Sequence, residues 1–198
     1  ALRLRKATNA LRQRSEWLRA RTHPDLPDLS DDALMRDLDE WLAPLAPPGA
    51  ATVEALLRGA QVDAALESLL TYEQRRLVDR EAPARLELPG GAPVPLDYSR
   101  GELSVSVRLQ RVLGMASHPR CGGAPVEFTL LSPADRPIQT TSDVPGFFSE
   151  GSYAEVRAEL KGRYPKHFWP EDPLQAEPLG NATKKQRQEA AARVGVGS

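Results

Sequence analysis

The spacing of apolar residues changes at Pro83, and this change constrains the fold more than any other feature of the chain. Before Pro83 the spacing is that of an amphipathic helix, as in the run Leu34, Leu38, Trp41, Leu42 and Leu45. After Pro83 apolar residues alternate with others, which is typical of half-buried strands. We therefore expect an α+β fold, with a helical subdomain over residues 1–82, an α+β domain over 83–179 and a basic tail over 180–198.

Local signals place the helices of the first part. Leucines recur at intervals of seven through residues 3–20, and Ser30 is a suitable N-cap for the second helix, which ends at the prolines from Pro44 onward. Further helices are expected over residues 52–58 and 62–81. Thr71 and Gln74 form a capping-box pattern that predicts an interruption of the last of these.

The second part is expected to contain antiparallel hairpins, a C-terminal helix and an extended proline-rich segment. One hairpin is predicted around the glycine turn at residues 89–91, and another around the turn at 132–137. Between them, residues 103–107 predict a short strand that turns into a helix ending at Gly114. A further helix is predicted from a Ser152 cap and a Glu155 capping box to Gly162, with Phe147 and Phe148 in the core.

Charge and cysteine content limit the functional classes. The single cysteine, Cys121, excludes an internal disulfide and favours the cytoplasm, and no apolar run approaches membrane-spanning length. Residues 1–21 hold seven basic residues against Glu16, and residues 22–40 hold seven acidic residues against Arg36. This segregation favours a basic helix lying beside an acidic one over a nucleic-acid-binding arm.

The segment GRYPKHFWPEDP, residues 162–173, combines rings, bases and three prolines, and it holds most of the candidate binding residues. Its rings could stack on bases while its cations contact phosphates. Alternatively, the rings could be buried as a structural plug, with Glu171 and Asp172 neutralising the neighbouring bases. The candidates for nucleic-acid binding are Arg136, Lys161, Arg163, Tyr164, Lys166, His167 and Trp169.

The motifs of several enzyme classes are missing from the sequence. It contains no GxxxxGK[ST] phosphate loop and no GxSxG nucleophile elbow. His118 and Cys121 supply only two of the four ligands of a tetrahedral metal site, so HPRCGG is interpreted as a surface loop. We therefore expect no catalytic residue, no metal and no cofactor in this chain, and no enzymatic activity of the chain by itself.

The chain resembles the C-terminal region of the HrpB family, which are bacterial DExH-box ATP-dependent helicases. The resemblance is carried by LSDDALMRDLDEWLAP (29–44), LVDREAP (77–83), LPGGAPVPLDY (88–98), VRLQRVLG (107–114), LLSPADRPIQTTSDVPGFF (130–148) and GSYAEVRAELKGRYPKHFWPEDP (151–173). Arg111, Leu113 and Phe148 depart from the family pattern at the margins of these motifs.

The resemblance implies a non-catalytic accessory region that follows an ATP-hydrolysing motor in the same parent chain. ATP and Mg²⁺ would act in that motor and not in this region. Single-stranded RNA or DNA is the partner that this interpretation implies. The alternative is a scaffold domain that docks a partner protein or buttresses the motor.

Overall fold

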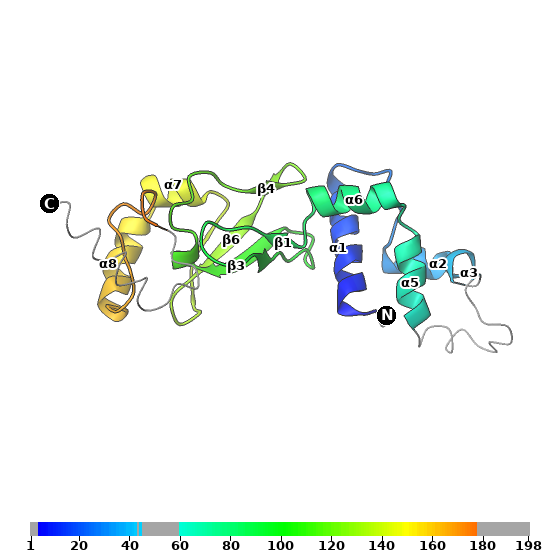
Figure 1. Ribbon diagram of the computed structural model, residues 1–198, viewed down its shortest axis with the longest axis horizontal. Helices are drawn as coiled ribbons and strands as arrows, with labels where there is room; N and C mark the ends of the chain where they lie inside the picture. Colours follow the sequence, from blue (N-terminus) through cyan, green and yellow to red (C-terminus); the bar gives the residue numbers. More distant parts are fainter. Residues whose placement is uncertain (1–3, 43, 45–59, 178–198) are drawn as a thin grey trace. The chain divides into compact units, whose positions relative to one another are not determined.

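A computed structural model describes residues 4–42, 44 and 60–177 (Figure 1). Its contacts divide the chain into two compact units. The first contains residues 1–84, 98–101 and 121–123, and the second contains residues 85–97, 102–120 and 124–198. The helix expected over 52–58 and the basic tail lie outside the described residues.

The first unit is helical. Its described α-helices are α1 (Lys6–Arg21), α2 (Asp31–Arg36), α3 (Leu38–Trp41), α5 (Ala60–Ser68) and α6 (Tyr72–Glu81). Helix α1 contacts α5 and α6 (Figure 1). Of the leucines spaced by seven, Leu18 is buried but Leu4 and Leu11 are only partly covered. The buried face of α1 instead includes Thr8, Arg14, Ser15 and Trp17, so the contact with α5 and α6 is partly polar.

Two predicted helix starts are confirmed in this unit. The Ser30 hydroxyl accepts a hydrogen bond from the Ala33 amide at 3.2 Å. Thr71 and Gln74 form both hydrogen bonds of the capping box, at 3.2 and 2.9 Å. Each of these contacts spans only three residues, which explains why the sequence alone could locate them.

The second predicted helix is broken, because Asp37 leaves the helical conformation at φ −100° and ψ 22°. The break separates α2 from α3. The indole nitrogen of Trp41 donates to the carbonyl oxygen of Leu34 at 2.9 Å, which ties the two short helices together. The apolar spacing of residues 34–42 is compatible with both arrangements, so it could not reveal the break.

The second unit is built on a three-stranded sheet with the order β3–β6–β7. Strands β6 (Glu127–Leu131) and β7 (Pro137–Thr141) pair antiparallel, which confirms the second predicted hairpin. Strand β3 (Ser104–Arg108) pairs with β6 in parallel, an arrangement that the sequence did not predict. The register places Val105 opposite Phe128 and Val107 opposite Leu130, and all four side chains are buried.

The first predicted hairpin and the strand after it are also present. Strands β1 (Arg85–Leu86) and β2 (Val94–Pro95) pair antiparallel over two residues each. The helix expected after residue 107 is wrong, because β3 is followed by a single 3-10 turn, η2 (Leu109–Arg111). Strand β3 pairs with β6 along its whole length, and this pairing holds residues 104–108 extended.

The HPRCGG motif forms a short hairpin rather than a surface loop. Strands β4 (Arg120–Cys121) and β5 (Ala124–Pro125) flank Gly122 and Gly123, which adopt φ values of +50° and +76°. The Cys121 side chain is buried, and burial raises the pKa of its thiol.

The C-terminal helix is present, but its expected cap is wrong. Helix α8 (Tyr153–Arg163) ends one residue after Gly162, and the Ser152 side chain makes no capping hydrogen bond. Ser152 has φ −78° and ψ 11°, whereas a capping serine normally has an extended backbone. A short helix, α7 (Val144–Ser149), precedes it and was not expected. Asp143 caps α7 by accepting from the Gly146 amide at 3.0 Å, and Phe147 and Phe148 are buried as predicted.

Candidate nucleic-acid interface

The proline-rich segment after α8 folds back and packs with that helix. Trp169 is only 6% exposed, and its indole nitrogen donates to the Tyr164 carbonyl oxygen at 3.0 Å. The buried Tyr153 hydroxyl on α8 donates to the Pro170 carbonyl oxygen at 2.7 Å. Burial raises the pKa of Tyr153 to about 12. The segment is therefore a strap that is held by hydrogen bonds at both ends of its aromatic run.

Arg157 of α8 fixes the strap where its aromatic run ends. Its Nε donates to the Trp169 carbonyl oxygen at 3.0 Å, and its Nη2 forms an ion pair with Glu171 at 2.8 Å. Glu171 therefore pairs with a base of α8, and not with the bases of the strap that it was expected to neutralise. Asp172 accepts hydrogen bonds from the backbone amides of Leu174 and Gln175.

The predicted binding residues of this region differ in exposure. Lys161, Arg163, Lys166 and His167 are exposed, whereas Tyr164 is half-buried. Tyr164 and His167 contact each other edge to face, with 6.1 Å between ring centroids. The cations and this ring pair are therefore accessible to a ligand, whereas the face of Trp169 is covered.

Arg163 forms an ion pair with Glu159, one helical turn away, at 3.2 Å. Both side chains are more than half exposed, so the pair contributes little to stability. Arg136 is exposed in the turn between β6 and β7. Beside it, Asp135 is held by two hydrogen bonds of 2.8 Å from Arg108, which lower the pKa of that carboxyl.

The first unit contains a groove that sequence reasoning missed. It has a volume of about 580 Å³ and lies between α1, the start of α2 and the loop at residues 98–101. Its lining residues are Asn9, Arg12, Gln13, Glu16, Trp17, Ala20, Arg21, Ser30, Asp31, Tyr98, Ser99 and Gly101. The signal in the sequence that could have indicated this site was an aromatic residue followed by a cation at four-residue spacing, Trp17 and Arg21.

Trp17 organises one part of the groove. Its ring packs edge to face with Tyr98 at a centroid distance of 5.3 Å. The Arg21 guanidinium lies 4.9 Å from the centroid of the Trp17 ring and donates to the Gly101 carbonyl oxygen at 3.2 Å. These two contacts orient an exposed cation at the edge of the groove.

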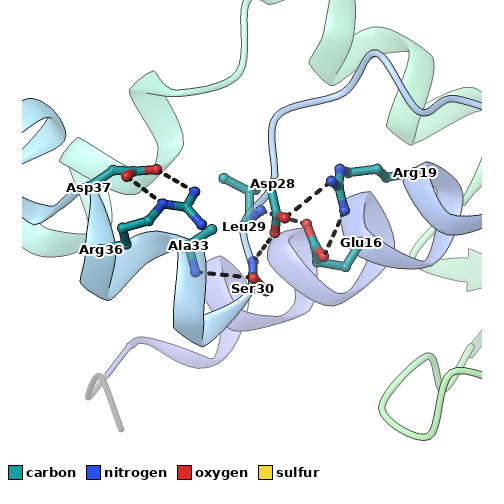
Figure 2. A network of polar contacts seen from close by, with 8 residues as sticks. All are labelled: Glu16, Arg19, Asp28, Leu29, Ser30, Ala33, Arg36 and Asp37. Atoms are coloured by element: carbon teal, nitrogen blue, oxygen red, sulfur yellow. Dashed lines mark hydrogen bonds and ion pairs between the residues drawn. The ribbon is translucent and has the colours of Figure 1, made fainter.

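The basic N-terminal helix is paired with acidic residues, as the charge segregation predicted. Arg12 contacts Asp31 at 2.7 Å and Arg19 contacts Asp28 at 3.1 Å. Figure 2 shows how Arg19 also meets Glu16, and how Asp28 accepts from the Ser30 amide. The hydrogen bonds from Ser30, aided by Arg19 and Arg36, lower the pKa of the Asp28 carboxyl.

Two further bases, one directly before α1 and one within it, contact acids on other helices. Arg5 contacts Asp63 of α5 at 3.4 Å, and Arg14 contacts Asp79 of α6 at 2.8 Å. The paired bases in and directly before α1 therefore contact both the acidic block that the sequence indicated and two acids that lie much further along the chain.

His118 has a structural role. Its Nδ1 accepts from the Val144 amide at 3.1 Å, and its Nε2 donates to the Val126 carbonyl oxygen at 2.7 Å. Among residues 4–42, 44 and 60–177, no group of three or more His, Cys, Asp or Glu side chains is arranged to hold a metal ion. Within the same ranges, no helix has the length and apolar character needed to cross a membrane.

Comparison with known proteins identifies the class. Residues 41–173 match the family described as "ATP-dependent helicase C-terminal", which is the HrpB C-terminal family, and the chain belongs to this family. In an alignment of 164 residues that covers 81% of this chain, it is 37% identical to "ATP-dependent RNA helicase HrpB" of Escherichia coli strain K12. The chain spans only about a fifth of that relative, 20% of its length.

Two crystal structures of the same Escherichia coli protein show a similar fold. The structure described as the DExH-box NTPase HrpB superposes with a TM-score of 0.75 and 33% identity, covering 90% of this chain and 22% of the other. The structure described as the DEAH/RHA helicase HrpB gives a TM-score of 0.59 and 30% identity, covering 83% and 21% of the two chains.

Proposed function

We propose that this chain is a non-catalytic accessory region of an ATP-dependent RNA helicase and that it contacts single-stranded nucleic acid through the end of α8. The accessory assignment is supported by family membership, since the similar Escherichia coli protein is a helicase of about four times this length, and the match covers 20% of it. ATP and Mg²⁺ act in the remaining part of the parent chain, and this region assists its motor domains.

The observation that carries the proposal is the burial of the aromatic end of the strap beside exposed cations at the end of α8 and the start of the strap. Trp169 and Pro170 are buried, while Lys161, Arg163 and Lys166 are exposed. Cations fixed on a rigid support are suited to phosphate contacts, because they need little further ordering when they bind. Tyr164 and His167 supply ring surface beside them for stacking on an unpaired base.

The experiment is a titration of labelled single-stranded RNA at several salt concentrations, with the wild-type chain and with the double variant Arg163→Ala, Lys166→Ala. Each phosphate contact on a single strand contributes about −0.7 to the slope of log affinity against log salt. We expect the double variant to lose about 1.4 from the magnitude of the slope and to bind more weakly. The matched control is Arg36→Ala, Arg80→Ala, which removes two exposed arginines from the first unit.

An unchanged affinity and slope in the first variant would exclude α8 as a nucleic-acid contact. The scaffold function is then the second candidate. The observation that favours it is the burial of Trp169, because a buried ring stabilises the fold and cannot stack on a ligand. On that reading the exposed end of α8 faces a protein surface.

A further inference from the structure

The groove beside α1 carries little net charge of its own, because its acids are already paired. Asp31 contacts Arg12 at 2.7 Å, and Glu16 accepts a hydrogen bond from the Leu29 amide at 2.6 Å. Arg12 also donates to the Leu29 carbonyl oxygen at 2.5 Å. These internal contacts leave neither carboxylate free to repel an anionic ligand, and they fix the wall formed by the start of α2.

Arg21 offers the groove an oriented, planar cation. One side of its guanidinium is occupied by the Trp17 ring, and one of its five N–H donors is used by the Gly101 carbonyl oxygen. Trp17 is only 4% exposed, so its own ring is closed to a ligand. The surface available for stacking at this position is therefore the guanidinium of Arg21, which is exposed.

Asn9 and Gln13 add hydrogen-bonding capacity on the same face of α1. They are separated by four residues and both line the groove. Within the described parts of the chain, neither side-chain amide makes a hydrogen bond. Each amide presents a donor and an acceptor side by side, which matches the edge of a nucleobase.

We propose that this groove is a second binding site for a short single strand of nucleic acid. A base stacks on the Arg21 guanidinium, and the Gln13 and Asn9 amides contact the edges of neighbouring bases. Unstacked bases are recognised in this manner, by stacking on planar side chains and by hydrogen bonds to their edges. The thirteen residues from Asn9 to Arg21 extend over about 18 Å of helix, which is long enough for several nucleotides. The choice of ligand rests on the proposed function.

The experiment measures the affinity of the wild-type chain for single-stranded oligonucleotides of about six nucleotides, within the usual range of site sizes. RNA and DNA of the same sequence are compared, because a preference for RNA would indicate a contact to the 2′-hydroxyl. We expect Arg21→Ala to weaken binding about tenfold, the loss of one stacked base. Arg21→Lys keeps the positive charge but removes the planar guanidinium, so we expect it to weaken binding nearly as much as Arg21→Ala does.

The chain offers a matched control for Arg21. Arg76 lies over the Tyr72 ring at 5.7 Å with the same spacing of four residues, in the same unit but outside the groove. Arg76→Ala is therefore expected to change the affinity less than twofold. Asn9→Ala with Gln13→Ala removes only groove amides and is expected to weaken binding several-fold, about the effect of one or two lost hydrogen bonds.

The outcomes separate this inference from the proposed function. Equal losses of affinity in Arg21→Ala and Arg76→Ala would overturn the proposed groove site, because the loss would then reflect the reduced total positive charge and not a local contact. Wild-type affinity in both Arg21→Ala and the amide double variant would also overturn it. If the groove variants lose affinity while the double variant Arg163→Ala, Lys166→Ala does not, the proposed contact at α8 is wrong and the groove site is supported. If only the α8 double variant loses affinity, the groove site is wrong and the α8 contact is supported. If the wild-type chain does not bind the oligonucleotides, both proposals are wrong.

Discussion

The two units solve the same packing problem in different ways. In each, a tryptophan is buried beside an arginine: Trp17 with Arg21 in the first unit, and Trp169 with Arg157 in the second. Trp169 is held by residues within twenty positions of it, and its indole nitrogen is hydrogen-bonded. Trp17 packs against Tyr98 and Gly122, and its indole nitrogen has no hydrogen-bond partner among the described residues.

The difference shows that a buried ring can be positioned mainly by local contacts, as Trp169 is, or by distant contacts, as Trp17 is. The hydrogen bonds described for Trp169 come from α8 and from the strap itself, and one distant contact is added at the end of the strap, where the Gly114 amide donates to the Pro173 carbonyl oxygen at 2.8 Å. The position of Trp17 depends on two loops that arrive from distant parts of the chain. We expect the first arrangement to resist small changes in the strap, and the second to be sensitive to any change in loop shape.

The largest effect is expected for Trp169→Ala. Removing this buried ring leaves a cavity, and we expect the free energy of unfolding to fall by about 3 to 5 kcal/mol. Denaturant unfolding followed by circular dichroism measures the change. Tyr164→Ala is the control, since Tyr164 is half-buried and should cost clearly less. An unchanged midpoint for Trp169→Ala would show that the strap is not part of the core.

Gly122→Ala tests the sensitivity of the first unit. Gly122 has φ +50°, and an added Cβ would lie 2.8 Å from Cζ3 of Trp17. Strain and overpacking together are expected to cost about 2 to 3 kcal/mol. Gly123→Ala is matched, because Gly123 has φ +76° but open space around its Cα. That variant should lose only about 1 kcal/mol from backbone strain. Equal thermal shifts in the two variants would mean that contact with Trp17 does not restrict this loop.

Tyr153→Phe is the mildest change, and it tests the hydrogen bond to the Pro170 carbonyl oxygen. Losing that bond is expected to cost about 1 kcal/mol at neutral pH. Tyr164→Phe is a suitable control, because the Tyr164 hydroxyl makes no hydrogen bond within the described residues. If both variants unfold at the same denaturant concentration, Tyr153 does not anchor the strap.

The same variant has a pH signature. Folding raises the pKa of Tyr153 from about 10 in an unfolded chain to about 12, because burial disfavours the phenolate. The stability that the neutral phenol contributes is therefore complete below pH 10 and is lost as the pH rises toward 12. We expect the wild-type chain to lose stability more steeply than Tyr153→Phe across this window. Parallel curves would contradict a buried phenol at this position.

Features that depend on a few neighbouring residues were predictable from the sequence. The Ser30 cap and the Thr71 capping box each join residues three positions apart, and both are present. The hairpin of β6 and β7 follows from alternation on either side of a short turn. The Ser152 cap failed for a local reason as well, because its backbone lacks the extended conformation that a capping hydroxyl needs.

Of the predicted site, the sequence located the segment but not the exposure of its members. Lys161, Arg163, Lys166 and Trp169 are equally prominent as residue types, yet only the tryptophan is buried. Whether a ring or a cation reaches solvent depends on what packs over it, and that is decided by the return of the strap along α8. The binding role of these residues, of Tyr164, His167 and of Arg136 stays a prediction.

The sequence by itself determined the change from helices to strands, the separation of charge along the N-terminal region and membership of the helicase C-terminal family. Each of these follows from residue order, through local hydrogen bonds and motif spacing. Only the tertiary structure decided the parallel pairing of β3 with β6, the burial of Trp17 against Gly122 and the groove beside α1. These features join residues that are far apart in the chain, and such contacts form only when the whole unit has folded.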